Sequence, residues 1–444
     1  MTHDHNQQEA DALRGLAHSL TLSRPDMRAT ACEVETQVAA ALASPTAIEA
    51  ERAFDHVARG LRAAWLKSVA AETAGVMRSP TEREVVRLEH GRHDVYGYER
   101  DFQPESLEAR CQAFFGAPPP GWTDAHVMFS SGQAALAAVL LHLAEGRRGK
   151  LRVAHVGAYF ETRELVRRAC AHVGDLSEAD CIVVEPIACD GRIATHDPAR
   201  IARGMKTDQT LIVDETLSPP VTRSQSLLSQ AIVPGATVIR LVSGLKLLQQ
   251  GLELANVGIV SLFNRDARQT AALADDLKRC RTLTGAGLRY VDALALEAPF
   301  FLDPAATVAY AERVFDHNGE LARAVMAHNR LFKPLAEARL DGGAPYCAFE
   351  LEADAGPQAL HALAGRIEHE AGARGFLFER GGSFGFRGHR YDVIEPETGD
   401  PPFLRVALGA RDDHSRKGII EMMAHVGRAG AGAFGSLGWT TDAR

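Results

Sequence analysis

The fold is decided by a short stretch, TLIVDET, at residues 210–216. It predicts a buried strand that ends in a carboxylate, Asp214. Similar apolar runs precede and follow it, separated by amphipathic segments, at residues 127–129, 151–156, 181–184, 237–242 and 257–262. Strands that alternate with helices predict an α/β fold, with a mostly parallel sheet covered on both faces. Such sheets bind ligands beyond the carboxyl ends of their strands, so we look for site residues there.

The rest of the chain predicts two further parts. Residues 1–90 look helical throughout, and Ser44 before Pro45 predicts the start of an amphipathic helix. A long helix over residues 305–329 leads into a region with short predicted strands, at 346–351, 375–378 and 403–407. We therefore expect a helical N-terminal extension (1–90), a large α/β domain (91–300) and a small C-terminal α+β domain (301–444).

Composition excludes several classes of protein. The 444 residues are 46% hydrophobic and carry a formal net charge of −8, which argues against a nucleic-acid partner or an anionic membrane surface. No apolar run reaches the ~18 residues of a membrane span, and the N-terminus lacks the order of a signal peptide. Seven scattered cysteines without a C-x-x-C pair predict a reducing cytoplasm. His90 and His93 have a metal-compatible spacing, but without a third ligand we expect no metal site.

A small-residue turn, Ser131-Gly132-Gln133, follows the strand that ends at Phe129 and opens a helix. Free backbone N–H groups and the helix dipole favour a phosphate at such a place. Ser131 can equally be a simple helix cap. The turn alone does not separate these two interpretations.

Two charged residues stand at the ends of apolar strands. Asp214 can cap the following turn, or it can pair with a protonated ring nitrogen of a cofactor. Lys246 lies in an otherwise uncharged stretch, residues 241–252. A lysine in apolar surroundings has a lowered pKa and becomes a nucleophile for carbonyl groups. The alternative is a lysine that extends to the solvent over apolar neighbours.

The order of these features favours the chemical alternatives. A phosphate turn, a strand-end aspartate and Ser-x-x-Lys (Ser243 to Lys246) match the needs of pyridoxal 5'-phosphate, which takes an anion cradle, a carboxylate and a Schiff-base lysine. Residues 94–430 resemble the fold-type I pyridoxal-phosphate enzymes (aspartate aminotransferase-like fold). Within them, the chain resembles the cysteine and methionine metabolism (trans-sulfuration) family, which includes the cystathionine and methionine γ-lyases.

Further segments carry the resemblance. Tyr98-Glu99-Arg100 is similar to a family segment whose tyrosine and arginine reach the cofactor phosphate of the neighbouring subunit, which implies a homodimer or homotetramer. The alternative for Arg100 is a surface ion pair. Tyr159 in a Tyr-x-x-Thr pattern resembles the tyrosine that stacks on the cofactor ring and moves a proton, although a core tyrosine would look alike. The resemblance also implies cofactor contacts from Thr216 and Ser243.

The C-terminal part carries the segments that resemble the family's substrate contacts. Ser383, in Gly-Gly-Ser-Phe-Gly, resembles a substrate-binding loop, and Arg405 resembles the arginine that binds the substrate α-carboxylate with its guanidinium fork.

Some positions depart from the family pattern. Leu245 replaces a hydroxyl residue, and the asparagine near the ring oxygen has no clear counterpart, so Cys189 or Asp190 takes its place. The resemblance implies a lyase that eliminates or replaces a β or γ leaving group of an amino acid, and the departures argue for a specialised pathway, such as biosynthesis of an unusual amino acid, over the family's ordinary sulfur substrates. The alternatives are an aminotransferase or γ-synthase on the same cofactor, and a non-catalytic binding subunit.

Overall fold

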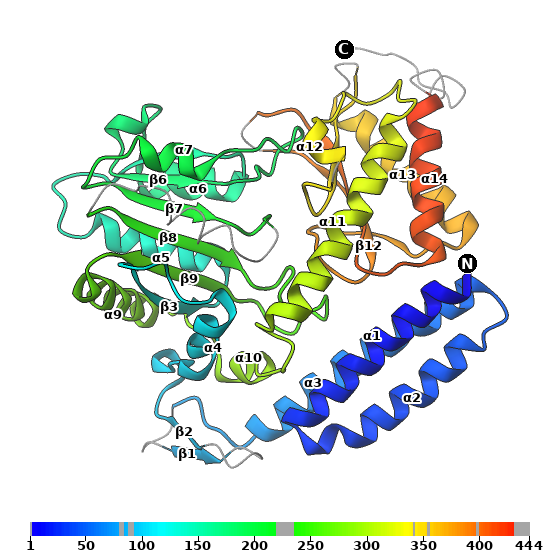
Figure 1. Ribbon diagram of the computed structural model, residues 1–444, viewed down its shortest axis with the longest axis horizontal. Helices are drawn as coiled ribbons and strands as arrows, with labels where there is room; N and C mark the ends of the chain where they lie inside the picture. The colour runs from blue at the N-terminus through cyan, green and yellow to red at the C-terminus, as the bar shows by residue number, and fades with distance from the viewer. Residues whose placement is uncertain are drawn as a thin grey trace.

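The computed structural model describes most of the chain; the described residues are 2–79, 84–87, 93–218, 235–340, 342–352, 356–396 and 399–429. Within them the elements form a large sheet with its helices, a small sheet with its helices, and three long N-terminal helices (Figure 1). The three helices lie along both of the other parts. The long helix α11 (Pro304–Met326) connects the large part with the small one.

The large sheet has seven strands among the described residues, in the order β3-β9-β8-β7-β6-β4-β5. They are β3 (Thr123–Phe129), β4 (Arg152–Val156), β5 (Ala171–His172), β6 (Cys181–Val184), β7 (Thr210–Asp214), β8 (Thr237–Ser243) and β9 (Gly258–Asn264). Only β9 pairs antiparallel with its neighbours, β3 and β8, while the other pairs are parallel. The predicted α/β fold is therefore confirmed.

Helices cover both faces of this sheet. Their bounds are α4 (Glu105–Phe115), α5 (Gly132–Ala144), α6 (Phe160–Ala169), α7 (Pro198–Arg203), α9 (Ala267–Thr284) and α10 (Tyr290–Ala295). The middle of strand β7 is apolar at successive positions because both of its faces are buried under helices. Ile212 packs in the cluster that contains α5 and α9, whereas Leu211 and Val213 pack in the cluster on the other face that contains α7.

The N-terminal helices are α1 (Thr2–Ser23), α2 (Arg28–Leu42) and α3 (Ala47–Thr73). They share one apolar core with parts of α10. The predicted cap at Ser44 is wrong. Helix α3 starts after Thr46, which accepts the N–H of Glu49 at 3.2 Å while its hydroxyl donates to the Glu49 carboxylate at 2.9 Å. This pair of bonds needs a glutamate three residues after the cap, and the residue three positions after Ser44 is Ala47.

We also expected residues 1–90 to be helical throughout. That prediction is wrong for the last residues of this segment. Residues Glu84–Arg87 form strand β1, which pairs antiparallel with β2 (His93–Tyr96). Two successive β-branched valines, Val85 and Val86, favour an extended backbone there. The predicted domain boundary after residue 90 lies outside the described residues, as does His90.

The small part has a sheet in the order β10-β13-β12-β11. Its elements, after α11, are α12 (Glu337–Leu340), β10 (Cys347–Phe349), α13 (Pro357–Arg374), β11 (Phe378–Arg380), β12 (His389–Ile394), β13 (Phe403–Ala407) and α14 (His414–Ala429). The strand predicted over 375–378 is misplaced, because Gly375 ends α13 in a left-handed conformation (φ +74°). The boundary predicted after residue 300 stays a prediction. None of the described helices has the length and apolar composition needed to cross a bilayer.

Candidate active site

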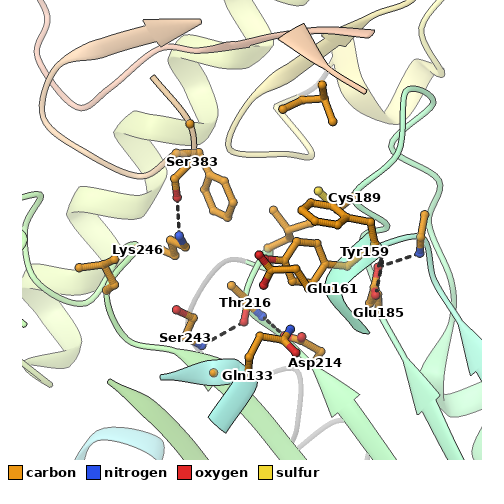
Figure 2. A pocket seen from close by; sticks show the side chains of 18 of the residues that line it. Gln133, Tyr159, Glu161, Glu185, Cys189, Asp214, Thr216, Ser243, Lys246 and Ser383 are labelled. Carbon is orange, nitrogen blue, oxygen red and sulfur yellow. Dashed lines mark hydrogen bonds between the residues drawn. The ribbon is translucent and has the colours of Figure 1, made fainter. Parts of the chain in front are cut away.

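A cavity of about 670 Å³ opens at the carboxyl ends of the parallel strands, between the large and the small part. It brings together residues that lie far apart in the sequence (Figure 2). The predicted site residues that line it are Ser131, Gly132, Gln133, Tyr159, Asp214, Thr216, Ser243, Lys246, Ser383 and Arg405. The structure therefore assembles ten of the twelve candidates in one place.

The polar end of the cavity is the start of α5. The Ser131 hydroxyl accepts the N–H of Ala134 at 3.1 Å, so Ser131 is the N-cap of this helix. The first N–H groups of a helix have no partner within the helix, and those of Gly132 and Gln133 belong to this set. Both residues line the cavity, so the helix start can hold an anion there. The cap and the anion site are thus compatible.

Asp214 ends β7 at the floor of the cavity. Its carboxylate accepts the N–H of Thr216 at 3.0 Å, and the Thr216 hydroxyl accepts the N–H of Ser243 at 3.0 Å (Figure 2). The pKa of Asp214 is raised to about 6, mainly by burial and further by the charge of Glu185. Hydrogen bonds from Thr216 lower it in part. A cation placed next to this carboxylate would hold it ionised, and it would in turn stabilise that cation.

Lys246 lies opposite, with its ammonium group directed at the small part. It donates a hydrogen bond to the hydroxyl of Ser383 (Figure 2). The rings of Phe384 and Phe386 have their centroids 5.5 and 6.0 Å from Nζ. Burial lowers the pKa of Lys246, and the positive charge of Arg405 lowers it further. A lowered pKa leaves a larger fraction of the amine free to act as a nucleophile and as a base at a given pH.

The loop that carries Lys246 spans residues 244–257, between β8 and β9, and it has little regular structure. Gln249 is fully buried at its centre and holds it together. The Gln249 amide donates to the carbonyls of Gly244 (3.0 Å) and Ala255 (2.6 Å). It also accepts the N–H groups of Leu254 (2.6 Å) and Ala255 (3.1 Å). Sequence reasoning missed this glutamine, since its partners are backbone atoms.

Tyr159 enters the cavity from the start of α6 and is held by Glu185. The buried Glu185 carboxylate accepts the N–H groups of Ala158 (3.0 Å) and Tyr159 (3.1 Å) and bonds to His155 at 2.8 Å. A Cβ on Gly157 would lie 2.4 Å from the Glu185 side chain, so only glycine fits there. Sequence reasoning missed Glu185 as a support.

The phenol of Tyr159 faces the carboxylate of Glu161, which also lines the cavity (Figure 2). Burial raises the pKa of Tyr159 far above its ordinary value, and the hydrogen bond with Glu161 raises it further. The phenol therefore stays protonated across the physiological range, so it can donate a hydrogen bond but is a weak acid.

Arg405 lies on β13 and is part of the cavity wall that the small part forms. Its guanidinium is 3.9 Å from the carboxylate of Asp392 on the neighbouring strand β12. The Arg405 side chain is only 11% exposed. A nearly buried guanidinium at a cavity wall is suited to a planar anion such as a carboxylate. Asp392 also lines the cavity and was not found from the sequence.

Of the two residues considered for the missing asparagine position, the structure places one in the cavity. Cys189 lines it, whereas the carboxylate of Asp190 accepts the N–H groups of Arg192 and Ala194 in a turn. Burial raises the pKa of the Cys189 thiol, so it stays protonated.

Tyr98 and Arg100 are the two candidates that do not line the cavity of their own chain in the part that the structure describes. Tyr98 precedes the short helical turn Glu99–Asp101 and Arg100 lies within it; Tyr98 is 39% exposed. The Arg100 guanidinium lies 5.3 Å from the centroid of the Tyr98 ring. Their role at a neighbouring subunit's site remains a prediction.

No family model and no curated protein sequence matches the chain. Several solved structures are similar to the chain. The chain is similar to a methionine γ-lyase, CalE6, from Micromonospora echinospora, with 21% identity, a TM-score of 0.54, and coverage of 83% of this chain and 98% of that one. It is similar to cystathionine γ-lyase from yeast, with 16% identity, a TM-score of 0.55, and coverage of 82% and 98%. For MetB from Corynebacterium glutamicum the identity is 17%, the TM-score 0.57, and the coverage 79% and 92%. The fold expected from the resemblance is confirmed.

Proposed function

We propose that the protein is a pyridoxal-phosphate-dependent enzyme of amino-acid metabolism that eliminates or replaces a leaving group at Cβ or Cγ. The observation that carries the proposal is the meeting of Lys246, Asp214 and the start of α5 in one cavity. They come from three separate strand ends that meet at one edge of the sheet, and each supplies a different group that the cofactor needs. The names of the similar structures, a methionine and a cystathionine γ-lyase, point to the same class of reaction.

The residues present fit this cofactor. The start of α5 offers backbone N–H groups to a phosphate. The hydrogen bond between Ser131 and Ala134 caps the helix and fixes the residue at which it begins. Asp214, whose pKa burial raises to about 6, gains a partner when a protonated ring nitrogen lies beside it. Lys246 has the lowered pKa that covalent attachment to an aldehyde requires. Leu245 supplies no hydroxyl, so the phosphate depends more on the backbone.

The bound cofactor supplies an electron sink for the Cα of an amino acid. The chain's own residues do the rest. Arg405 binds the α-carboxylate and so orients the Cα–H bond. Lys246 removes the Cα proton as a base. Tyr159, whose phenol stays protonated beside Glu161, donates a hydrogen bond to the leaving group.

The test uses the purified protein with added pyridoxal phosphate. We expect a visible absorbance band, and borohydride reduction that fixes the cofactor to the peptide containing Lys246. Lys246→Ala should abolish both, whereas Lys150→Ala, an exposed lysine before β4, should keep both. A wild-type protein without the band would contradict the proposal.

Product analysis then decides the reaction type. Release of ammonia and a keto acid without a second substrate indicates elimination, and formation of a new Cβ or Cγ bond to an added nucleophile indicates replacement. Dependence on an amino acceptor indicates an aminotransferase and would correct the proposed reaction.

We further propose an active homodimer or homotetramer in the cytoplasm, in which Tyr98 and Arg100 complete the phosphate site of the neighbouring subunit. Their exposure on the surface of their own chain supports this. Arg100→Ala should weaken cofactor retention. A monomer in solution with full cofactor occupancy would show that the assignment is wrong.

A further inference from the structure

The N-terminal helices reach the loop that carries Lys246. Arg62 of α3 donates from Nε to the carbonyl of Leu252 at 2.8 Å, and from Nε and Nη2 to the carbonyl of Glu253 at 3.2 and 2.9 Å. These carbonyls belong to the loop 244–257. A guanidinium spans two neighbouring carbonyls because its N–H groups are fixed in one plane.

The segment that Arg62 holds has an unusual backbone. Gln250 (φ +51°), Gly251 (φ +71°) and Glu253 (φ +48°) are all left-handed. A left-handed residue other than glycine is strained and persists only where its surroundings impose it. Gly251 has no room for a side chain, because a Cβ there would lie 2.3 Å from the Tyr310 hydroxyl and 2.5 Å from the Arg387 backbone nitrogen.

Two hydrogen bonds connect this segment with the start of the loop that carries Lys246. The N–H of Leu252 donates to the carbonyl of Gln249 at 2.9 Å, and the Gln249 amide donates to the carbonyl of Gly244 at 3.0 Å. Gly244 stands two residues before Lys246. On the far side, the Lys246 backbone lies against Gly385, where a Cβ would come within 3.1 Å of it. The lysine thus lies on a loop that is held at both ends.

We propose that Arg62 is a positioning residue for Lys246, so that the N-terminal helices are part of the catalytic unit. The role given to Lys246 rests on the proposed function. The hydrogen bonds of Arg62 hold the strained segment, and that segment keeps the lysine in its apolar surroundings. Without them, the segment relaxes toward ordinary backbone angles and Lys246 moves toward water.

The groups around Lys246 determine how its pKa would change if the lysine moved toward water. Arg405 lowers its pKa, while Glu161, Cys189 and Glu253 act in the opposite direction and burial dominates. A more hydrated amine has a higher pKa. Loss of Arg62 should therefore raise the pH at which the amine becomes free to react.

The experiment measures how fast cofactor-free protein develops the visible band after addition of pyridoxal phosphate, as a function of pH. For Arg62→Met we expect the midpoint to rise by about half a unit to one unit, and coupling at pH 7 to slow by about three- to tenfold. Arg62→Lys, which keeps a donor and the charge, should recover part of both. Hydrogen exchange of residues 244–257, which needs no cofactor, should become faster in Arg62→Met.

Two controls separate positioning from stability. Arg59→Met removes the same charge from the same helix, but Arg59 is 65% exposed and bonds to Asp55 and Glu379. Trp65→Phe removes a buried bond from the indole to the Ala295 carbonyl (2.9 Å) and should lower the melting temperature. Neither should move the pH midpoint.

The proposal is overturned if Arg62→Met keeps the wild-type midpoint and exchange rates, or if Trp65→Phe moves the midpoint as much. If the wild-type protein itself never develops the band, the proposed function fails, and the exchange rates alone decide whether Arg62 holds the loop.

Discussion

Two regions of the active site hold their residues in different ways. At the ends of the parallel strands, Ser131 and Asp214 are fixed by bonds to neighbours two or three residues away. In the loop 244–257, Lys246 depends on the buried Gln249 and on Arg62, which is 190 residues from its partner Leu252. Strand ends are positioned by the sheet itself, whereas an irregular loop needs side chains that replace a missing hydrogen-bond ladder. The loop should therefore be the more sensitive of the two to single substitutions away from the reacting groups.

The largest effect is expected from Gln249→Leu. It leaves two carbonyls and two N–H groups in the loop without their partner, which should lower the free energy of unfolding by about 3–4 kcal/mol. Urea unfolding of the cofactor-free protein measures this. Gln112→Leu, at an exposed position of α4, is the matched control and should change stability by less than about 0.5 kcal/mol. Equal effects of the two variants would remove the contrast between loop and strand ends.

At the strand ends, Asp214→Asn should act in the opposite direction. The folded-state pKa of Asp214 is about 6, above its ordinary value of 3.8, so the folded protein binds this proton more tightly than the unfolded chain does. The wild type therefore loses stability as the pH rises from about 4 to 6. Asp214→Asn should remove that loss and stabilise the cofactor-free protein at pH 7 by about 1–2 kcal/mol. Urea unfolding at several pH values tests it, with exposed Asp208→Asn as the unchanged control.

Thr216→Val probes the bond that joins two strand ends. It leaves the N–H of Ser243 without its acceptor and should cost about 1 kcal/mol. Thr36→Val, on the exposed side of α2, is the control in the same unfolding measurement. A cost above that of Gln249→Leu would show that the strand ends, and not the loop, depend most on side chains.

The smallest effect is expected from Gln250→Gly. Gln250 has φ +51°, and its buried amide nitrogen has no hydrogen-bond partner among the described residues, so glycine should stabilise the cofactor-free protein by about 0.5 kcal/mol. Gln37→Gly, in the middle of α2, should do the reverse and cost about 1 kcal/mol. A destabilised Gln250→Gly would mean that the loop holds no backbone strain at this position.

The sequence predicted the parts of the site that follow from local rules. Asp214 stands at the end of an apolar run and Ser131 opens a helix, so the sheet places both. Lys246 follows an apolar run, which predicts the edge of the sheet at which it lies, but its position also depends on the supports of its loop. Thr46 could have been found as well, because Glu49 three residues later completes the Thr-x-x-Glu pattern of a helix start. The resemblance added Tyr159, Ser383 and Arg405.

The supports could not be predicted in the same way. Glu185, Gln249 and Arg62 act through backbone groups that any residue would present, so no residue type at the other end marks the contact. Asp392 reaches the cavity through the register of β12 with β13, which depends on pairing across the small sheet. Such contacts become visible only when the two chain segments are placed side by side.

The contacts of α3 and α1 with the small part also constrain how the chain is made. Asp55 pairs with Arg411 across 356 positions, Glu51 caps the start of α14 across 364, and Glu9 meets Arg387 across 378. During synthesis at about 5–20 residues per second, the first helices leave the ribosome roughly 20–70 s before these partners exist. Their shared apolar core, which includes Leu13, Val38 and Trp65, lets them associate with one another meanwhile. These helices therefore form their contacts with the small part long after they are made, whereas the bonds from Arg62 to the lysine loop can form earlier.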